Sequence, residues 1–122
     1  MDQALRIIPM GGVGEIGRNM LVIEYGESIL IVDAGLMFPN NDMLGIDIVI
    51  PDLTYVAENA QRVKAIIVTH GHEDHVGALP YLLDKVKSPV YATKLTRGLI
   101  EVKLKEARIS AVELHTVTAT DT

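Results

Sequence analysis

Residues 63–75 have the sequence VKAIIVTHGHEDH, in which an apolar, β-branched run leads directly into three histidines and two acids. The run over residues 63–69 predicts a buried strand, because it is short and rich in Val and Ile. The segment from Val76 to Val86 has helical spacing, in which Pro80 is acceptable only near the first turn. The histidine cluster is therefore expected at a turn between a strand and a helix.

The spacing within this cluster allows its side chains to converge on one point. Alternate residues of a strand share a face, so His70 and His72 are expected to point the same way. Asp74 and His75 can turn toward them from the start of the helix, and Gly71 is expected to relieve crowding between the first two histidines. Imidazole and carboxylate ligands without sulfur suit zinc, iron or manganese. The cluster therefore predicts a metal site.

Four such ligands, with others from elsewhere in a protein, are better used by two divalent ions about 3.5–4 Å apart than by one. A bound metal lowers the pKa of water from about 15.7 to about 7, which generates a hydroxide nucleophile at neutral pH. The ions would also hold the charge that develops on an attacked phosphoryl or carbonyl group. The alternative, a solvated polar loop, suits a lone histidine better than five such side chains in six residues.

The remaining elements follow from periodicity and turn residues. Glycine and proline punctuation indicates a long loop over residues 34–53. Two apolar runs around Gly26 predict an antiparallel hairpin that is covered on both faces. The mixture of strands and helices predicts an α/β fold of layered sheet and helix. The expected strands span residues 5–10, 20–25, 28–33, 63–69, 89–92 and 109–117, and the expected helices span 54–61 (with Thr54 as N-cap), 76–86 and 94–107.

Composition limits the class of protein. The 122 residues make one domain at most, or part of one, and 48% hydrophobic with 22% charged residues is a core-forming composition. The absence of cysteine excludes disulfides and thiolate metal sites and fits a reducing cytoplasm. No apolar run is long enough for a membrane span, and no signal peptide is indicated. The net charge of −5 is the wrong sign for phosphate binding by this chain alone.

Three further patterns are weaker candidates for function. Residues 12–17 match G-x-G-x-x-G, but a hairpin rather than a helix is expected next, which favours a tight loop near the metal site over dinucleotide binding. Paired acids at Asp47 and Asp52 are better explained by Asx turns in a solvated loop. Basic residues over 94–108 alternate with acids, which favours a solvated helix face over RNA contact. Near the glycine loop, Glu15, Arg18 and Asn19 are candidates for substrate contact, with a simple turn as the alternative.

The pattern His70-x-His72-x-Asp74-His75 resembles the defining motif of the metallo-β-lactamase superfamily, and Asp33 matches its upstream Asp. The resemblance implies a four-layer αββα sandwich in which His70 and His72 hold one metal ion and Asp74 and His75 hold the other. It also implies that Asp74 is catalytic and that Asp33 supports the metal ligands without binding the metal itself. The variable position, Glu73, is expected to face solvent.

Four blocks, residues 11–19, 33–39, 45–52 and 69–82, resemble the bacterial ribonuclease J family within a match over about residues 5–93. This resemblance implies a cytoplasmic, homo-oligomeric hydrolase that cuts RNA as a 5′ exonuclease, an endonuclease or both. A metal-activated hydroxide would attack the phosphate. Its two divalent ions would be Zn²⁺, with Mn²⁺ as the alternative. Another hydrolase of the superfamily, acting on small esters, thioesters or phosphodiesters, stays open.

The chain differs from that family by stopping early. The later His, Asp and His ligands of the family are not evident, and His115 is expected to be a strand residue with no ligand role. Residues 1–122 are therefore expected to form the N-terminal, incomplete portion of a lactamase-like domain, inactive as an enzyme when isolated. Such a portion would leave apolar sheet surface uncovered, which predicts self-association or help from a partner chain.

Overall fold

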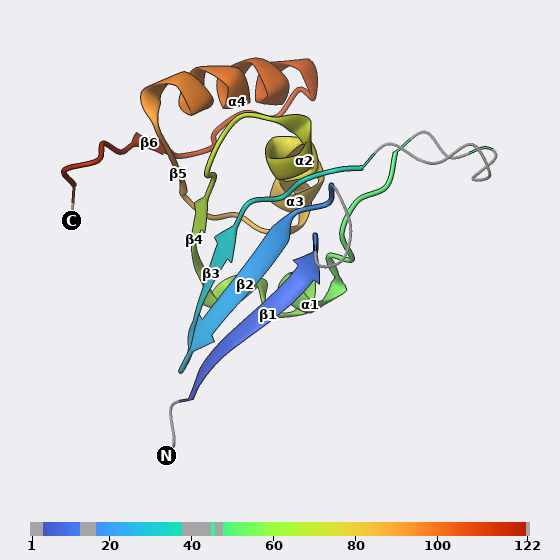
Figure 1. Ribbon diagram of the computed structural model, residues 1–122, viewed down its shortest axis with the longest axis vertical. Helices are drawn as coiled ribbons and strands as arrows, with labels where there is room; N and C mark the ends of the chain where they lie inside the picture. Colours follow the sequence, from blue (N-terminus) through green and yellow to red (C-terminus); the bar gives the residue numbers. More distant parts are fainter. Residues whose placement is uncertain (1–3, 13–16, 38–44, 46–47, 122) are drawn as a thin grey trace.

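The computed structural model describes residues 4–12, 17–37, 45 and 48–121 (Figure 1). Its strands form a six-stranded sheet in the spatial order β1-β2-β3-β4-β5-β6. The strands are β1 (Leu5–Gly11), β2 (Met20–Tyr25), β3 (Ser28–Val32), β4 (Val63–Ile67), β5 (Val90–Ala92) and β6 (Leu114–Thr116); the helices are α1 (Thr54–Glu58), the 3-10 helix η1 (Ala60–Arg62), α2 (Glu73–Val76), α3 (Leu79–Lys85) and α4 (Lys94–Glu106). The predicted α/β order of elements is confirmed.

The sheet is mixed. Strands β1, β2 and β3 are antiparallel neighbours, whereas β3, β4, β5 and β6 run parallel. The predicted hairpin turns at Gly26, whose φ of 58° is a conformation that glycine adopts without strain. The parallel strands β3 and β4 end side by side, with Val32 paired to Ile67. Ligands of open α/β sheets bind beyond the carboxyl ends of parallel strands, so a site is expected where β3 and β4 end.

One face of the sheet packs against the helices. Buried strand residues and buried helix residues form a single aliphatic cluster. Each fully buried side chain of this kind contributes roughly 1.5–3 kcal/mol to folding. The cluster includes Val22, Ile29, Ile31, Ile66 and Val90 from the strands, and Val56, Leu79, Leu82, Leu83, Ile100 and Leu104 from the helices.

The opposite face of the sheet is only partly covered. Along the hairpin, Leu21, Ile23 and Leu30 are half-buried, and Ile7 on β1 is 60% exposed. The prediction that the hairpin is covered on both faces is therefore wrong. The described helices pack into a core on one side, so the apolar residues on the other side lack a covering layer within the described residues.

Three local expectations also need correction. The predicted helix over 76–86 is divided into α2 and α3, which places Pro80 in the first turn of α3. Thr54 is the first residue of α1 rather than its N-cap, and its backbone N–H donates to Oδ1 of Asp52 at 2.9 Å. The last strand begins at Leu114 rather than at Ile109, and Ala111, inside the predicted strand, has a φ of 61°, which is not an extended conformation.

Two other expectations concern the paired acids Asp47 and Asp52 and a membrane span. The turn at Asp52 agrees with the expected Asx turn, whereas Asp47 lies outside the described residues. No helix within the described residues is both long enough and apolar enough to cross a membrane.

Candidate metal centre

The loop that carries the histidines is fixed by backbone contacts with the segment that follows β3. The N–H of Ala34 donates to the carbonyl of His75 at 2.8 Å, and that of Leu36 donates to the carbonyl of Glu73 at 2.9 Å. Between them, a Cβ atom on Gly35 would overlap the carbonyl of Asp74, so glycine is required for this close approach. The ends of β3 and β4 are thereby joined through α2.

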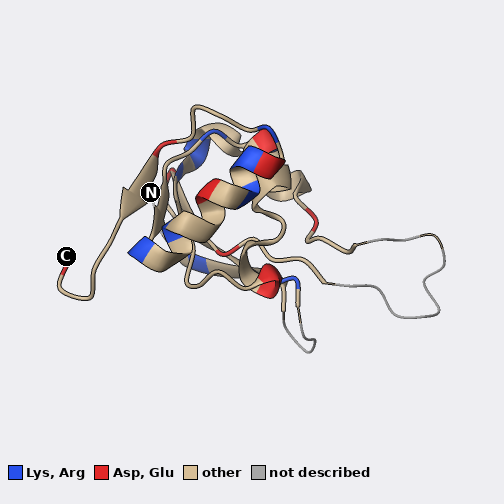
Figure 2. Cartoon of the chain, turned by 90° about the horizontal axis from the view of Figure 1, so that it is seen from above, with Lys and Arg blue, Asp and Glu red and all other residues tan. Residues whose placement is uncertain are grey.

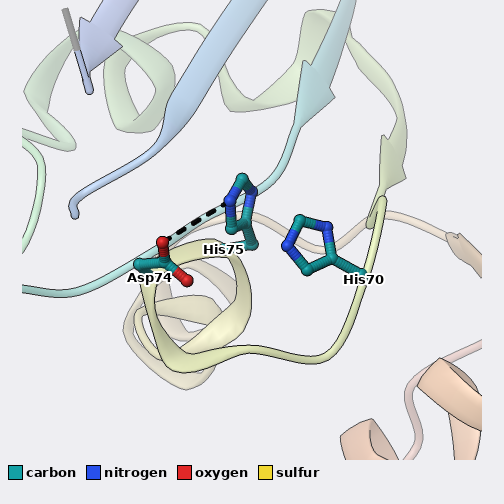
Figure 3. Close-up of side chains that lie close together, drawn as sticks. All are labelled: His70, Asp74 and His75. Atoms are coloured by element: carbon teal, nitrogen blue, oxygen red, sulfur yellow. Dashed lines mark ion pairs between the residues drawn. The ribbon is translucent and has the colours of Figure 1, made fainter. Parts of the chain in front are cut away.

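Three of the four predicted ligands meet beyond the carboxyl ends of β3 and β4. His70, Asp74 and His75 offer ligand atoms that all lie within 4.8 Å of one another (Figure 3). The ring centroids of His70 and His75 are 3.9 Å apart, and Nε2 of His75 is 3.6 Å from Oδ2 of Asp74. All three residues are half-buried. Two imidazoles and a carboxylate, held together and still accessible, fit a divalent transition metal ion.

His72 lies beside this group without being part of it. It is exposed and stands at the N-cap position of α2, and its ring is nearly perpendicular to that of His70, with 4.9 Å between ring centroids. The structure therefore brings together three of the four predicted ligands and places the fourth next to one of them. Metal binding by His72 stays a prediction.

Asp33 holds the cluster in place through hydrogen bonds to Thr69 and a contact with His75. It follows β3 with a φ of 64°, a left-handed conformation that Asp adopts more readily than most residues. Its buried carboxylate accepts hydrogen bonds from the backbone N–H of Thr69 at 2.7 Å and from the Thr69 hydroxyl at 2.8 Å. The same carboxylate lies 2.8 Å from Nδ1 of His75. These contacts are those expected of a residue that orients metal ligands.

Helix α4 braces the outer side of the loop. A Cβ atom on Gly71 would meet the end of the Leu99 side chain on α4, which would have to shift to make room for it. The predicted relief of crowding between the two histidines stays a prediction. Glu73, expected to face solvent, is 44% exposed and forms an ion pair with Lys103 at 2.5 Å. The expectation for Glu73 is thus incomplete, because a partner from α4, distant in sequence, holds it.

The three residues predicted to contact substrate are Glu15, Arg18 and Asn19, and the structure describes two of them. The Asn19 side-chain amide donates to the carbonyl of Asp74 at 2.8 Å, so Asn19 supports the ligand loop. Arg18 donates its backbone N–H to the carbonyl of Leu36 at 3.2 Å. Glu15 lies outside the described residues. Substrate contact by these three residues stays a prediction.

The other candidates are not members of the metal group found among the described residues. On α4, Arg97 pairs with Glu101 at 3.0 Å, and basic and acidic residues are mixed along the helix (Figure 2), as expected of a solvated face. His115 stacks on Tyr91 with 4.7 Å between ring centroids and contacts Glu113 at 2.6 Å. His115 has no place in the metal group found among the described residues.

Sequence reasoning gave no role to Thr69, although its hydroxyl touches both Asp33 and the ring of His70. The signals in the sequence are its place directly before the first histidine and at the start of the block over residues 69–82. The residues that meet here come from the end of β3 and the loop after β4, so the hydroxyl's partners become visible only in three dimensions.

A model of the metallo-beta-lactamase superfamily matches residues 13–111, and the chain belongs to that superfamily. Membership implies divalent metal ions. The fold agrees with two solved lactamases: one from Hirschia baltica (TM-score 0.50, 22% identity, 98% of this chain and 48% of that one), and a B3 metallo-beta-lactamase with an active-site glutamic acid (TM-score 0.55, 16% identity, 94% and 44%). The predicted fold class is confirmed.

Among curated proteins, the chain is similar to Ribonuclease J2 of Bacillus subtilis, with 59% identity over 84% of this chain and 18% of the relative. It is also 51% identical to Ribonuclease J 2 of Staphylococcus aureus strain MRSA252, over 95% of this chain and 21% of the relative. These identities confirm the predicted ribonuclease J resemblance. The chain spans about a fifth of the length of these relatives.

Proposed function

We propose that this chain carries part of the catalytic centre of a metal-dependent ribonuclease that cuts RNA phosphodiester bonds from the 5′ end, internally or both. The observation that carries the proposal is the convergence of His70, Asp74 and His75 above the buried Asp33, in a chain 59% identical to a ribonuclease J2. The proposed metal content is two divalent ions, Zn²⁺ or, as the alternative, Mn²⁺. Imidazole and carboxylate donors suit both ions.

In this proposal, His70 and His72 hold one ion, and Asp74 and His75 hold the other. When bound, such ions activate water as a nucleophile at neutral pH and stabilise charge on a phosphoryl group. Asp33 keeps the ring of His75 in place through its contact with Nδ1. Asp74, whose side chain is 38% exposed, retains carboxylate surface that can accept a hydrogen bond from the attacking water.

The RNA-binding surface and the remaining ligands are proposed to lie outside residues 1–122, which would form the N-terminal portion of an incomplete lactamase-like domain. Two observations support this division. The chain covers only 48% and 44% of the lactamases that share its fold. Its net charge of −5 opposes binding to phosphates. The cysteine-free sequence and the ribonuclease relatives support a place in the cytoplasm.

The decisive experiment uses the whole protein that contains this chain. Cleavage of 5′-monophosphorylated RNA is expected to be abolished by His72→Ala and by Asp74→Ala, and retained by the control His115→Ala, which removes a histidine outside the cluster. Retained cleavage in the first two variants would contradict the proposal. Hydrolysis of small esters or thioesters in place of RNA would favour the alternative substrate class.

Metal content tests the site in the chain itself. Inductively coupled plasma mass spectrometry after dialysis against zinc is expected to give about two zinc ions per chain if water or a second copy supplies the remaining ligands of each ion. One ion would mean that only the group of His70, Asp74 and His75 is assembled here. No ion, with the fold intact, would contradict metal binding by these residues alone.

A further inference from the structure

The hydroxyl of Thr69 lies between two groups of the metal centre. Its Oγ1 is 2.8 Å from Oδ2 of Asp33 and 3.1 Å from Nδ1 of His70. The backbone N–H of the same residue donates to the other carboxylate oxygen, Oδ1 of Asp33, at 2.7 Å. Thr69 is thus attached to one carboxylate at two points. Because a β-branched side chain has few χ1 rotamers, this attachment fixes where its hydroxyl points.

The number of protons decides the direction of each hydrogen bond. A hydroxyl carries one proton, and an ionised carboxylate can only accept. The Thr69 proton therefore goes to Asp33, which leaves only lone pairs of Oγ1 facing Nδ1 of His70. Nδ1 must then carry the ring proton of His70, and Nε2 keeps its lone pair.

The same count applies to His75. Its Nδ1 lies 2.8 Å from Oδ2 of Asp33, so Nδ1–H donates to the carboxylate and Nε2 is left bare. Nε2 of His75 is the nitrogen that lies 3.6 Å from Oδ2 of Asp74. One carboxylate oxygen therefore sets the tautomer of His75 directly and that of His70 through a hydroxyl.

We propose that Thr69 is a positioning residue that transmits the hydrogen-bonding preference of Asp33 to His70, so that both rings present Nε2 to a metal ion. The proposal rests on the proposed function in one respect, namely that His70 and His75 bind metal. Without the hydroxyl, the two tautomers of a neutral imidazole compete, and the tautomer with N–H at Nε2 cannot bind the ion. Such outer partners of metal ligands typically change metal affinity by about 10- to 100-fold.

Two substitutions separate the hydroxyl from the shape of the side chain. Thr69→Val keeps the branched shape and removes the hydroxyl, whereas Thr69→Ser keeps the hydroxyl and loses a methyl group. Thr116→Val is the matched control, because Thr116 is also exposed and its hydroxyl accepts a hydrogen bond from Arg97 at 3.1 Å. Since Thr69 is exposed and its N–H bond to Asp33 does not need the side chain, Thr69→Val is expected to fold.

The first readout is the tautomer of His70 in the metal-free chain, from ¹⁵N-imidazole NMR at pH about 8, where a free imidazole is neutral. The wild type, Thr69→Ser and Thr116→Val are expected to carry the proton on Nδ1 of His70. Thr69→Val is expected to give a mixture of both tautomers at His70 with His75 unchanged. The second readout is zinc affinity by chelator competition, expected to fall about 10- to 100-fold in Thr69→Val only.

The proposal is wrong if His70 keeps its Nδ1 proton in Thr69→Val, or if Thr69→Ser loses as much zinc affinity as Thr69→Val. Circular dichroism and thermal unfolding check that each variant keeps the wild-type fold. The tautomer needs no metal, so it decides the role of Thr69 even if the wild-type chain binds no zinc. A wild-type chain that binds no zinc would contradict the proposed function and not the role of Thr69.

Discussion

Asp33 is the residue on which the orientation of the centre depends. It contacts His75 directly and reaches His70 through Thr69. Asp33→Asn keeps the shape of the side chain but replaces one acceptor oxygen with an N–H donor. His75 then loses its orienting acceptor, and the Thr69 hydroxyl loses the acceptor that directs its proton away from His70. Zinc affinity is therefore expected to fall by about 10- to 100-fold and at least as far as in Thr69→Val.

Chelator competition measures this affinity, and Asp84→Asn on the exposed side of α3 is the control with the same change in charge. Equal affinities for Asp33→Asn and Asp84→Asn would show that the buried carboxylate has no influence on the metal site.

Gly35 gives a second prediction at the residue scale. A Cβ at this position overlaps the Asp74 carbonyl, so Gly35→Ala must push the ligand loop away from β3. Overpacking of this kind costs roughly 1–3 kcal/mol. Gly98→Ala in α4 is the matched control, because a Cβ there meets open space and alanine favours a helix by about 0.5–1 kcal/mol.

Urea unfolding of both glycine variants is expected to give opposite signs, with Gly35→Ala less stable and Gly98→Ala more stable than the wild type. A Gly35→Ala variant as stable as the wild type would show that the loop can shift without loss.

The sequence predicts the ligands of this centre better than their supports. His70, Asp74 and His75 are identifiable because metal-binding side chains rarely gather within six residues by chance. The need for glycine at position 35 is not identifiable, since the carbonyl that it approaches belongs to Asp74, distant along the chain. The role of Thr69 likewise depends on an acid that precedes it by 36 residues.

At the scale of elements, the buried carboxylate of Glu24 connects β1, β2 and the segment around α1. Glu24 on β2 is 5% exposed and accepts hydrogen bonds from Arg6 at 2.9 Å and from the hydroxyl of Tyr55, with Arg62 at 3.2 Å. The Tyr55 hydrogen bond and the charges of Arg62 and Arg6 lower the pKa of Glu24 below its ordinary value of 4.5, against the opposing effect of burial. These contacts fasten the hairpin to α1.

The lowered pKa gives the sign of a pH effect. The unfolded chain takes up a proton at Glu24 near pH 4.5, before the folded chain does, so the stabilisation is complete above that pH and is lost as pH falls through the folded pKa. Glu24→Gln is expected to be less stable at neutral pH and to lose less stability on acidification. Urea midpoints between pH ~3 and ~7 measure this.

Glu106→Gln on the exposed face of α4 is the control and is expected to follow the pH dependence of the wild type. Equal acid sensitivity in Glu24→Gln and the wild type would mean that other carboxylates cause the acid destabilisation.

The elements themselves are largely predictable, with one instructive exception. The break between α2 and α3 falls where the N–H of Ala78 would bond the carbonyl of Asp74 in a continuous helix. That carbonyl is instead taken by Asn19, and Ala78 donates to the carbonyl of Ala34 at 2.7 Å. Helical periodicity over 76–86 contains no sign of this competition, because both competing partners belong to distant segments.

At the scale of the whole molecule, the outer face of the sheet carries continuous apolar rows. Pairing register aligns Ile7 with Ile23, Ile23 with Leu30, and Leu30 with Ala65, so one row crosses β1 to β4. A second apolar row crosses β1 to β5 through Pro9, Leu21, Val32, Ile67 and Tyr91, and the histidine His115 follows it on β6. The sequence predicted uncovered sheet surface, but only the register shows which residues form it.

A surface of this kind favours association, because removing apolar area from water yields roughly 25 cal/mol per Å². We expect the chain to associate with a second copy through this face and to bind a hydrophobic dye wherever the face stays open. Ile7→Lys is the informative variant, because Ile7 is 60% exposed and can be charged without disturbing the core. Leu95→Lys is its control, since Leu95 is 77% exposed on α4, away from the sheet.

Sedimentation velocity at micromolar concentration is expected to show dimers or larger species for the wild type and Leu95→Lys, and a shift toward monomer for Ile7→Lys. A second copy seated on this face would protect its rows from dye, so dye binding should rise as Ile7→Lys dissociates. If the wild type is a clean monomer that binds no dye, the half-buried rows are already sufficiently covered and the predicted homo-oligomer is wrong. If Leu95→Lys dissociates as readily as Ile7→Lys, association runs through α4 and the sheet face is not the contact.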